Sequence, residues 1–237
     1  MNARLILLPG LAADETMWEA QRTALAAWAP VVSDIHMQDH ETLEAMAAAL
    51  LASHEGDFVL CGASMGGMIA MEVARQAPAR VAGLALLGTT ARPETPEMRQ
   101  VRETAIELFG QGRAMEVIEA NVGFAFHPDN ARDAVLVRAY LDFVERAGAG
   151  QLIRQNRAVI SRPDARTHLP ALRCATLVMC GDSDQLTPPE CSAEIAELVP
   201  GAELATVARC GHMLTMEQPG AVNAILKAWL EQWPRWA

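Results

Sequence analysis

Short apolar runs that alternate with helical segments constrain the fold of this chain more than any other feature. The runs are rich in Val, Ile and Leu and lack the polar alternation of a half-exposed strand; they cover residues 4–8, 31–35, 58–61, 81–87, 176–180 and 203–207. Such strands, when separated by helices, are typical of a parallel sheet covered on both faces. The sequence therefore predicts an α/β fold with a mostly parallel sheet of about six strands.

Helix signals fill most of the intervals between these runs. Thr16 and Glu19 have the spacing of a capping box, which predicts a helix over 16–28 that Pro30 stops. Further helices are predicted over 42–53, 65–76 and 224–233. In the last of these, Trp229 and Trp233 fall on one side, and we expect that side to pack on the sheet.

The interval from residue 91 to residue 169 breaks the alternation, because it has helical periodicity and no strand-like run. Glycines and a proline divide it into predicted helices over 96–109, 113–121, 130–146 and 151–161. This helical block is too large for a single crossover connection. We therefore predict an inserted helical cap at 91–169 and a core made of residues 1–90 and 170–237.

Charge and composition restrict the partners of the chain. A net charge of −10 would repel nucleic acid and anionic membranes. The longest apolar runs, such as 45–52, are far shorter than the roughly 18 residues of a membrane helix. The apolar stretch near the N-terminus is broken by Pro9-Gly10, which is typical of a strand and loop rather than an export signal. We expect a cytoplasmic protein with a small-molecule substrate; a homo-oligomer is compatible with the sequence.

Cysteines and glycines give no indication of a metal or a cofactor. The five cysteines are odd in number and include no C-x-x-C pair, so we expect buried reduced thiols. The glycine-rich stretch at 62–67 lacks the lysine of a phosphate-binding P-loop and the spacing of a dinucleotide-binding fingerprint. We therefore predict no metal site and no cofactor.

The same glycine-rich stretch matches G-x-S-x-G, with Ser64 between a predicted strand and a predicted helix. In this motif a sharp turn exposes the serine, and the glycines, here Gly62 and Gly66, let helix and strand pass closely. A serine hydroxyl becomes a nucleophile only with a base, an acid that orients the base, and donors for the oxyanion. Ser64 is thus a candidate nucleophile whose partners should follow other strands.

An acid and a base follow the last two predicted strands. Asp182 and Asp184 compete for the acid in GDSDQLTPP; we favour Asp184, which lies further along the loop, and assign Asp182 to a local turn. His212 follows the last strand, where Gly211 frees the backbone. The other histidines are assigned to surface or structural positions: His36, His40, His54, His127 and His168. The predicted triad is Ser64, Asp184 and His212, which is the chain order typical of α/β-hydrolases.

Oxyanion donors are predicted next to the strand ends. The Pro9-Gly10 turn after the first strand presents the backbone N–H of Leu11. The second donor is the N–H of Met65, at the start of the helix that follows Ser64, where the helix dipole favours negative charge.

These motifs resemble those of the α/β-hydrolase superfamily over essentially the whole chain. The resemblance is carried by LLPGLAADETMW, GASMGG, GDSDQLTPP and CGHMLTMEQP, and is strongest to small carboxylesterases and enol-lactonases. It implies that Gly67 allows close helix packing and that Glu217-Gln218-Pro219 caps the final helix. The chain departs from the family in three ways: we expect the two N-terminal strands usual in this fold to be missing, Pro9 replaces a common histidine, and residues 35–39 replace an Arg-Gly-x-Gly loop.

The ordered triad implies a serine hydrolase that acts on a small carboxylic ester or lactone through an acyl-enzyme. Two alternatives stay open. One is carbon–carbon bond hydrolysis of a ring-cleavage product, with Arg154 or Arg157 binding its carboxylate; the other is a binding protein without catalysis. Candidates for an apolar acyl pocket are Met98, Phe109, Phe124 and Phe126.

Overall fold

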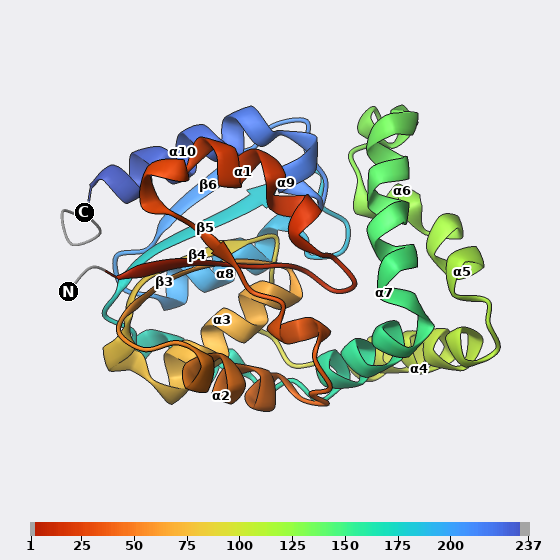
Figure 1. Ribbon diagram of the computed structural model, residues 1–237, viewed down its shortest axis with the longest axis horizontal. Helices are drawn as coiled ribbons and strands as arrows, with labels where there is room; N and C mark the ends of the chain where they lie inside the picture. Colours follow the sequence, from red (N-terminus) through yellow and green to blue (C-terminus); the bar gives the residue numbers. More distant parts are fainter. Residues whose placement is uncertain (1–2, 233–237) are drawn as a thin grey trace.

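The computed structural model describes residues 3–232. Its sheet has six strands, all parallel, in the order β2-β1-β3-β4-β5-β6 (Figure 1). The strands are β1 (Arg4–Leu8), β2 (Val31–Val32), β3 (Phe58–Ala63), β4 (Val81–Leu87), β5 (Ala175–Gly181) and β6 (Glu203–Val207). The predicted α/β fold with a parallel sheet of about six strands is confirmed.

The strand order reverses between β1 and β3. From β1 the chain crosses to β2 at one edge, returns past β1 to β3, and then continues to β6 at the other edge. Open parallel sheets bind ligands at such a reversal, outside the carboxyl ends of the strands. The segments that follow β1 and β3 therefore begin on either side of the expected crevice.

β2 is shorter than the strand predicted over 31–35, because the chain turns away after Val32. The hydroxyl of Ser33 accepts a hydrogen bond from the N–H of Ile35 at 3.3 Å, and Ile35–Met37 forms a 3₁₀ turn, η3. The side chain of Ile35 is buried. Its apolar character thus reflects packing in the core and not membership of a strand.

Helices cover both faces of the sheet, since successive strand residues point to opposite sides. On β1, Leu5 and Leu7 belong to one core, and Ile6 and Leu8 belong to the other. Outside residues 91–169 the helices are α1 (Glu19–Ala24), α2 (Leu43–Ser53), α3 (Met65–Gln76), α8 (Pro189–Leu198), α9 (Leu214–Glu217) and α10 (Pro219–Glu231). Helices α2, α3 and α8 lie on one face and α1 and α10 on the other (Figure 1).

The helix predicted over 16–28 is divided, and its capping box is wrong. The segment comprises η1 (Glu15–Trp18), α1 and η2 (Ala26–Trp28). The cap is Asp14, whose carboxylate accepts from both the N–H and the hydroxyl of Thr16. The remaining 3₁₀ turns are η4 (Pro78–Arg80), η5 (Asn130–Arg132), η6 (Ala165–Thr167) and η7 (Leu169–Ala171).

The C-terminal helix α10 packs on the sheet as predicted, and its Trp229 is buried. The other tryptophan expected on that side, Trp233, lies outside the described residues. Among residues 3–232, no helix has the length and apolar character needed to cross a bilayer.

The interval between β4 and β5 is helical, as expected, and lies at one end of the sheet (Figure 1). It contains α4 (Pro96–Gly110), α5 (Ala114–Ala120), α6 (Val122–Ala125) and α7 (Ala134–Ile160). The two helices predicted over 130–146 and 151–161 form α7, which kinks at Gly148 (φ 73°, ψ 167°). The assignment of residues 91–169 to a separate cap stays a prediction.

The ends of this interval are joined to each other. The N–H of Ala165 donates to the carbonyl of Ala91 at 2.9 Å. The buried carboxylate of Glu94 binds Arg102 at 2.6 Å and Arg162 at 2.8 Å. The chain segment that leads from β4 into α4 and the segment that leads from α7 back to β5 are therefore joined to each other by hydrogen bonds and ion pairs.

Candidate active site

Ser64 occupies a strained turn between β3 and α3. Its backbone has φ 52° and ψ −117°, which a residue with a side chain adopts at a cost of about 1–3 kcal/mol. Two contacts hold the turn: the N–H of Ser64 donates to the carbonyl of Leu87 at 2.9 Å, and the Thr89 hydroxyl donates to the Ser64 carbonyl at 2.7 Å. This strand-to-helix turn is the local structure that G-x-S-x-G predicts.

The glycines around Ser64 are required by close backbone contacts. A Cβ atom on Gly62 would collide with the carbonyl of Gly66, and one on Gly66 would collide with the carbonyl of Leu8. A Cβ on Gly67 would lie 2.8 Å from the Cβ of Thr89. α3 therefore packs directly against β1 at Gly66 and against the end of β3 at Gly62.

The side chains of Ser64, His212 and Asp184 are joined by hydrogen bonds. His212 Nε2 lies 2.9 Å from Ser64 Oγ, and His212 Nδ1 lies 2.8 Å from Asp184 Oδ2. The ring that donates from Nδ1 to the carboxylate leaves Nε2 free to accept the serine proton. The three residues predicted from separate segments are thus brought together.

Asp184 is buried and saturated with hydrogen bonds. Its Oδ1 accepts from the N–H groups of Leu186 and Thr187, both at 2.9 Å, and its Oδ2 also accepts from the Thr187 hydroxyl at 2.9 Å. Burial alone would raise the pKa of Asp184, but the nearby His212 and these hydrogen bonds lower it below its ordinary value. Asp184 therefore stays ionised at neutral pH, with Oδ2 facing Nδ1 of His212.

Asp182, the competing acid, has a different role from the local turn predicted for it. Its carboxylate accepts from the N–H groups of Arg209 at 2.9 Å and Cys210 at 3.1 Å. These residues precede His212. Asp182 therefore connects the loop after β5, which carries Asp184 (the acid loop), to the loop after β6, which carries His212 (the histidine loop).

Glu217 does not cap α10, contrary to the expectation from its Glu-x-Pro sequence, since α10 has no side-chain cap. Its Oε1 accepts from the N–H groups of Gly211 at 3.0 Å and Met213 at 3.1 Å. Its Oε2 accepts from the N–H of His127 at 2.8 Å and the side-chain amide of Asn130 at 2.9 Å. Glu217 therefore fixes both neighbours of His212 to the segment that follows α6.

The turn after β1 lies against Ser64. A Cβ on Gly10 would be 3.4 Å from the Cβ of Ser64. Among the described residues, the backbone N–H groups of Leu11 and Met65 have no hydrogen-bond acceptor. Met65 also opens α3, where the helix dipole favours negative charge. Neither predicted oxyanion donor is thus committed to another hydrogen bond among the described residues.

The other predicted candidates are divided between buried and exposed positions. Phe109 and Phe126 are buried, whereas Met98 and Phe124 are exposed. Sequence reasoning missed Tyr140, which contacts Phe126 and Phe143 edge-to-face at 5.4 and 5.2 Å between ring centroids. The carbonyl of Ala125 accepts from the N–H of His212 at 3.0 Å. Phe126, the first residue of this aromatic cluster, directly follows Ala125 in the sequence.

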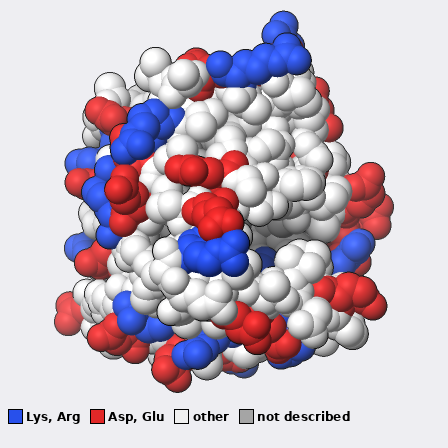
Figure 2. Space-filling view, turned by 90° about the vertical axis from the view of Figure 1, so that its right-hand side faces the viewer, with Lys and Arg blue, Asp and Glu red and all other residues white. Residues whose placement is uncertain are grey.

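The end of the molecule formed by α4–α7 has a hollow near its centre (Figure 2). Uncharged side chains border most of this hollow, a basic group borders it on one side with acidic groups next to it, and further acidic and basic side chains are interspersed over the face. Arg154, a candidate for binding a substrate carboxylate, binds the side chains of Gln151 and Asp39. Arg157 is exposed.

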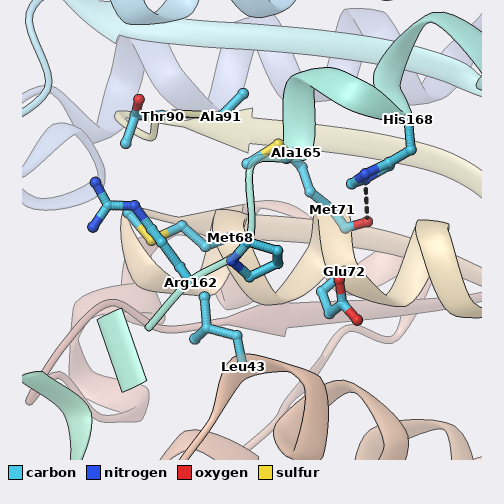
Figure 3. Close-up of a pocket in the computed structure, with 10 residues that line it drawn as sticks. Leu43, Met68, Met71, Glu72, Thr90, Ala91, Arg162, Ala165 and His168 are labelled. Atoms are coloured by element: carbon cyan, nitrogen blue, oxygen red, sulfur yellow. Dashed lines mark hydrogen bonds between the residues drawn. The ribbon is translucent and has the colours of Figure 1, made fainter. Parts of the chain in front are cut away.

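A separate pocket lies beside α3 and contains none of the predicted site residues (Figure 3). Arg162 in this lining binds Glu94, and His168 Nε2 lies 3.2 Å from the carbonyl of Met71, whereas His168 Nδ1 is buried and has no hydrogen-bond partner among the described residues. The lining residues are Leu43, Met68, Met71, Glu72, Thr90, Ala91, Arg162, Pro163, Ala165 and His168. Residues 3–232 contain no group of three or more His, Cys, Asp or Glu side chains that could hold a metal ion.

The other histidines take the structural positions expected of them. His36 is buried, with Nε2 2.7 Å from the carbonyl of Ala13. His127 Nδ1 accepts from the N–H of Asp129 at 3.1 Å. His212 is therefore the histidine that reaches Ser64.

Known proteins resemble this chain in sequence and in structure. It is 30% identical to a thermophilic esterase from Thermogutta terrifontis, with a TM-score of 0.87 over 98% of this chain and 90% of that one. The enol-lactonase from Burkholderia xenovorans LB400 has 22% identity and a TM-score of 0.84 over 98% and 92% of the two chains, which shows a shared fold.

The sequence comparisons agree with the structural ones. A protein of Klebsiella pneumoniae subsp. pneumoniae named "Putative carbamate hydrolase RutD" is 27% identical over 94% of this chain and 89% of its own length. A profile of the alpha/beta hydrolase fold matches residues 13–219, which is most of the chain. With its all-parallel sheet and strained serine turn, the chain belongs to the alpha/beta hydrolase fold family.

Proposed function

We propose that this protein hydrolyses a small carboxylic ester or lactone, with Ser64 as nucleophile, His212 as base and Asp184 as the orienting acid. The observation that carries the proposal is the continuous hydrogen-bonded chain from Asp184 through His212 to Ser64. It ends at a serine in a strained turn, and the N–H of Met65, the next residue, donates to no acceptor among the described residues. A binding protein would have no need to maintain this combination.

The reaction follows from these positions. His212 Nε2 takes the proton of Ser64 Oγ as the oxygen attacks the substrate carbonyl carbon. The resulting oxyanion accepts hydrogen bonds from the N–H groups of Leu11 and Met65. His212 then gives its proton to the leaving alkoxide, and an acyl-enzyme remains on Ser64. A water molecule, deprotonated by His212, attacks this ester; its proton passes to Ser64 Oγ as the acid product leaves.

The relatives support this class of substrate, since one is an esterase and another an enol-lactonase by name. A carbamate, which the name of a third relative indicates, presents a carbonyl group to the same nucleophile and belongs in the test panel. The alternative of carbon–carbon bond hydrolysis has less support, because Arg154 is engaged by Asp39 and Gln151.

Two further expectations are kept as proposals. Residues 91–169 form a cap over the core made of 1–90 and 170–237, and α6 contributes the part nearest the histidine loop. The protein works in the cytoplasm, where its cysteines, which form no disulfide among the described residues, stay reduced.

The test is a substrate profile of the purified protein. It compares p-nitrophenyl esters of two to eight carbons, simple lactones, an aryl carbamate and a ring-cleavage diketone acid. Ser64→Ala should abolish turnover of the preferred substrate without changing the circular dichroism spectrum. Ser53→Ala is the matched control, because its hydroxyl donates only to the carbonyl of Leu50 on α2. Undiminished turnover by Ser64→Ala would refute the proposal.

A further inference from the structure

The turn that carries Leu11 contains a second strained residue. Ala12 has φ 61°, in the left-handed region that alanine adopts at a cost of roughly 1–2 kcal/mol. Both Ala12 and Ala13 are buried. A buried backbone in this conformation persists only where its surroundings determine it.

Two buried side chains hold this turn. The N–H of Ala12 donates to Oε1 of Gln155 at 2.7 Å, and Gln155, on α7, is completely buried. The carbonyl of Ala13 accepts from Nε2 of His36 at 2.7 Å. Burial lowers the pKa of His36, so at neutral pH the ring is uncharged and carries its proton on Nε2, which faces the carbonyl.

The two supports are themselves joined, because Nε2 of Gln155 donates to the carbonyl of His36 at 2.9 Å. The strained turn, η3 and α7 thus form one closed hydrogen-bonded circuit of buried groups. The three contacts of this circuit together restrict the turn to one geometry. Nδ1 of His36, which takes no part in them, has no hydrogen-bond partner among the described residues.

The circuit determines the orientation of the Leu11 N–H. This N–H shares a rigid peptide plane with the carbonyl of Gly10, which accepts from the N–H of Ala13 at 3.2 Å. The next peptide plane is fixed by the contact between the N–H of Ala12 and Gln155. Both peptide planes that flank the Cα of Leu11 are therefore held, and the second is held by a side chain of α7.

We propose that Gln155 is a positioning residue for the oxyanion hole, which keeps the N–H of Leu11 in the orientation that receives the substrate oxyanion. The inference rests on the proposed function. It assigns to α7, a helix of the inserted segment, a direct part in the rate of the chemical step. Gln155 acts through the backbone and touches no substrate.

Gln151 provides a matched control on the same helix. It is also a buried glutamine, and its Nε2 also donates to the carbonyl of His36, at 2.6 Å. Its Oε1, however, accepts from Arg154 and not from the turn. Methionine has a volume similar to that of glutamine but no amide, so either substitution removes a buried amide without leaving a large cavity. Only Gln155→Met releases the N–H of Ala12.

The experiment measures kcat and KM of wild type, Gln155→Met and Gln151→Met on the best p-nitrophenyl ester, with melting temperatures for each. Gln155→Met should lower kcat by about ten- to a hundredfold with KM within about twofold, since a displaced oxyanion donor affects the transition state. Gln151→Met should keep kcat within about threefold. Gln155→Asn, whose shorter amide cannot reach Ala12, replaces Gln155→Met if that variant does not fold.

Equal kcat losses in the Gln155 and Gln151 variants, in step with their melting temperatures, would overturn the positioning role. So would an unchanged kcat in both. These outcomes are distinct from failure of the proposed function, in which the wild-type protein itself shows no turnover and no labelling of Ser64 by a fluorophosphonate.

Discussion

Substituting Glu217 with glutamine removes one of two acceptor oxygens, each of which serves a different segment. The carboxylate accepts four hydrogen bonds, two on each oxygen: from Gly211 and Met213, and from His127 and Asn130. A glutamine keeps one acceptor oxygen, and its NH₂ group faces the other pair of donors. Each unpaired buried donor costs about 1–3 kcal/mol. Because Glu217 is partly exposed, we expect a loss of about 2–4 kcal/mol.

This magnitude distinguishes the observed contacts from the helix cap that the sequence suggests, since a lost cap costs about 1 kcal/mol. The assay is urea unfolding with linear extrapolation, supported by a melting temperature about 4–16 °C lower. Gln218→Ala is the control, because it removes a single hydrogen bond, to the carbonyl of Arg209. The kcat should also fall by about tenfold, since either the two neighbours of His212 or the segment after α6 lose their acceptor at residue 217. A loss of 1 kcal/mol or less would refute the reasoning.

Three further predictions concern the acid and the serine turn. Asp184→Asn should lower kcat by about 10⁴-fold in steady-state assays, because the amide favours the His212 tautomer that cannot accept the serine proton. Because the pKa of Asp184 is lowered in the folded state, its carboxylate contributes fully to stability above pH of about 4, and this contribution is lost as the pH falls through the folded-state pKa. The difference in unfolding free energy between wild type and Asp184→Asn should therefore shrink below pH of about 4. Gly66→Ala should cost about 3 kcal/mol or more in urea unfolding through its collision with the Leu8 carbonyl, whereas Gly110→Ala, with open space around its Cβ position, should change stability by about 1 kcal/mol or less.

The fold was predictable because its signals are local. Continuous apolar runs indicated the parallel strands, and the glycines at 148 and 150 indicated the break in α7 that occurs at Gly148. The failures have a common cause in long-range contacts. Thr16 has the spacing of a cap, yet the carboxylate that caps η1 belongs to Asp14, which also binds Arg146 from α7 at 2.8 Å.

Two residues near the candidate site show the same limit. Glu217 lies next to a helix start in the sequence, which predicts a local helix cap. Two of the donors to its carboxylate, however, come from the distant residues His127 and Asn130. Gln155 is one glutamine in a long helix, and no periodicity marks it as a partner of Ala12. The juxtaposition of Ser64, Asp184 and His212 could be predicted because each residue follows the end of a strand, and parallel sheets bring such ends together at one edge.

The most direct test of the central claim is covalent labelling of Ser64. The protein is incubated with a fluorophosphonate, and intact mass and peptide mapping identify the adduct. We predict one adduct per chain, on Ser64, with labelling abolished in Ser64→Ala and slowed strongly in His212→Ala. Absence of any adduct on the folded wild-type protein, or an adduct on another residue that persists in Ser64→Ala, would contradict the account.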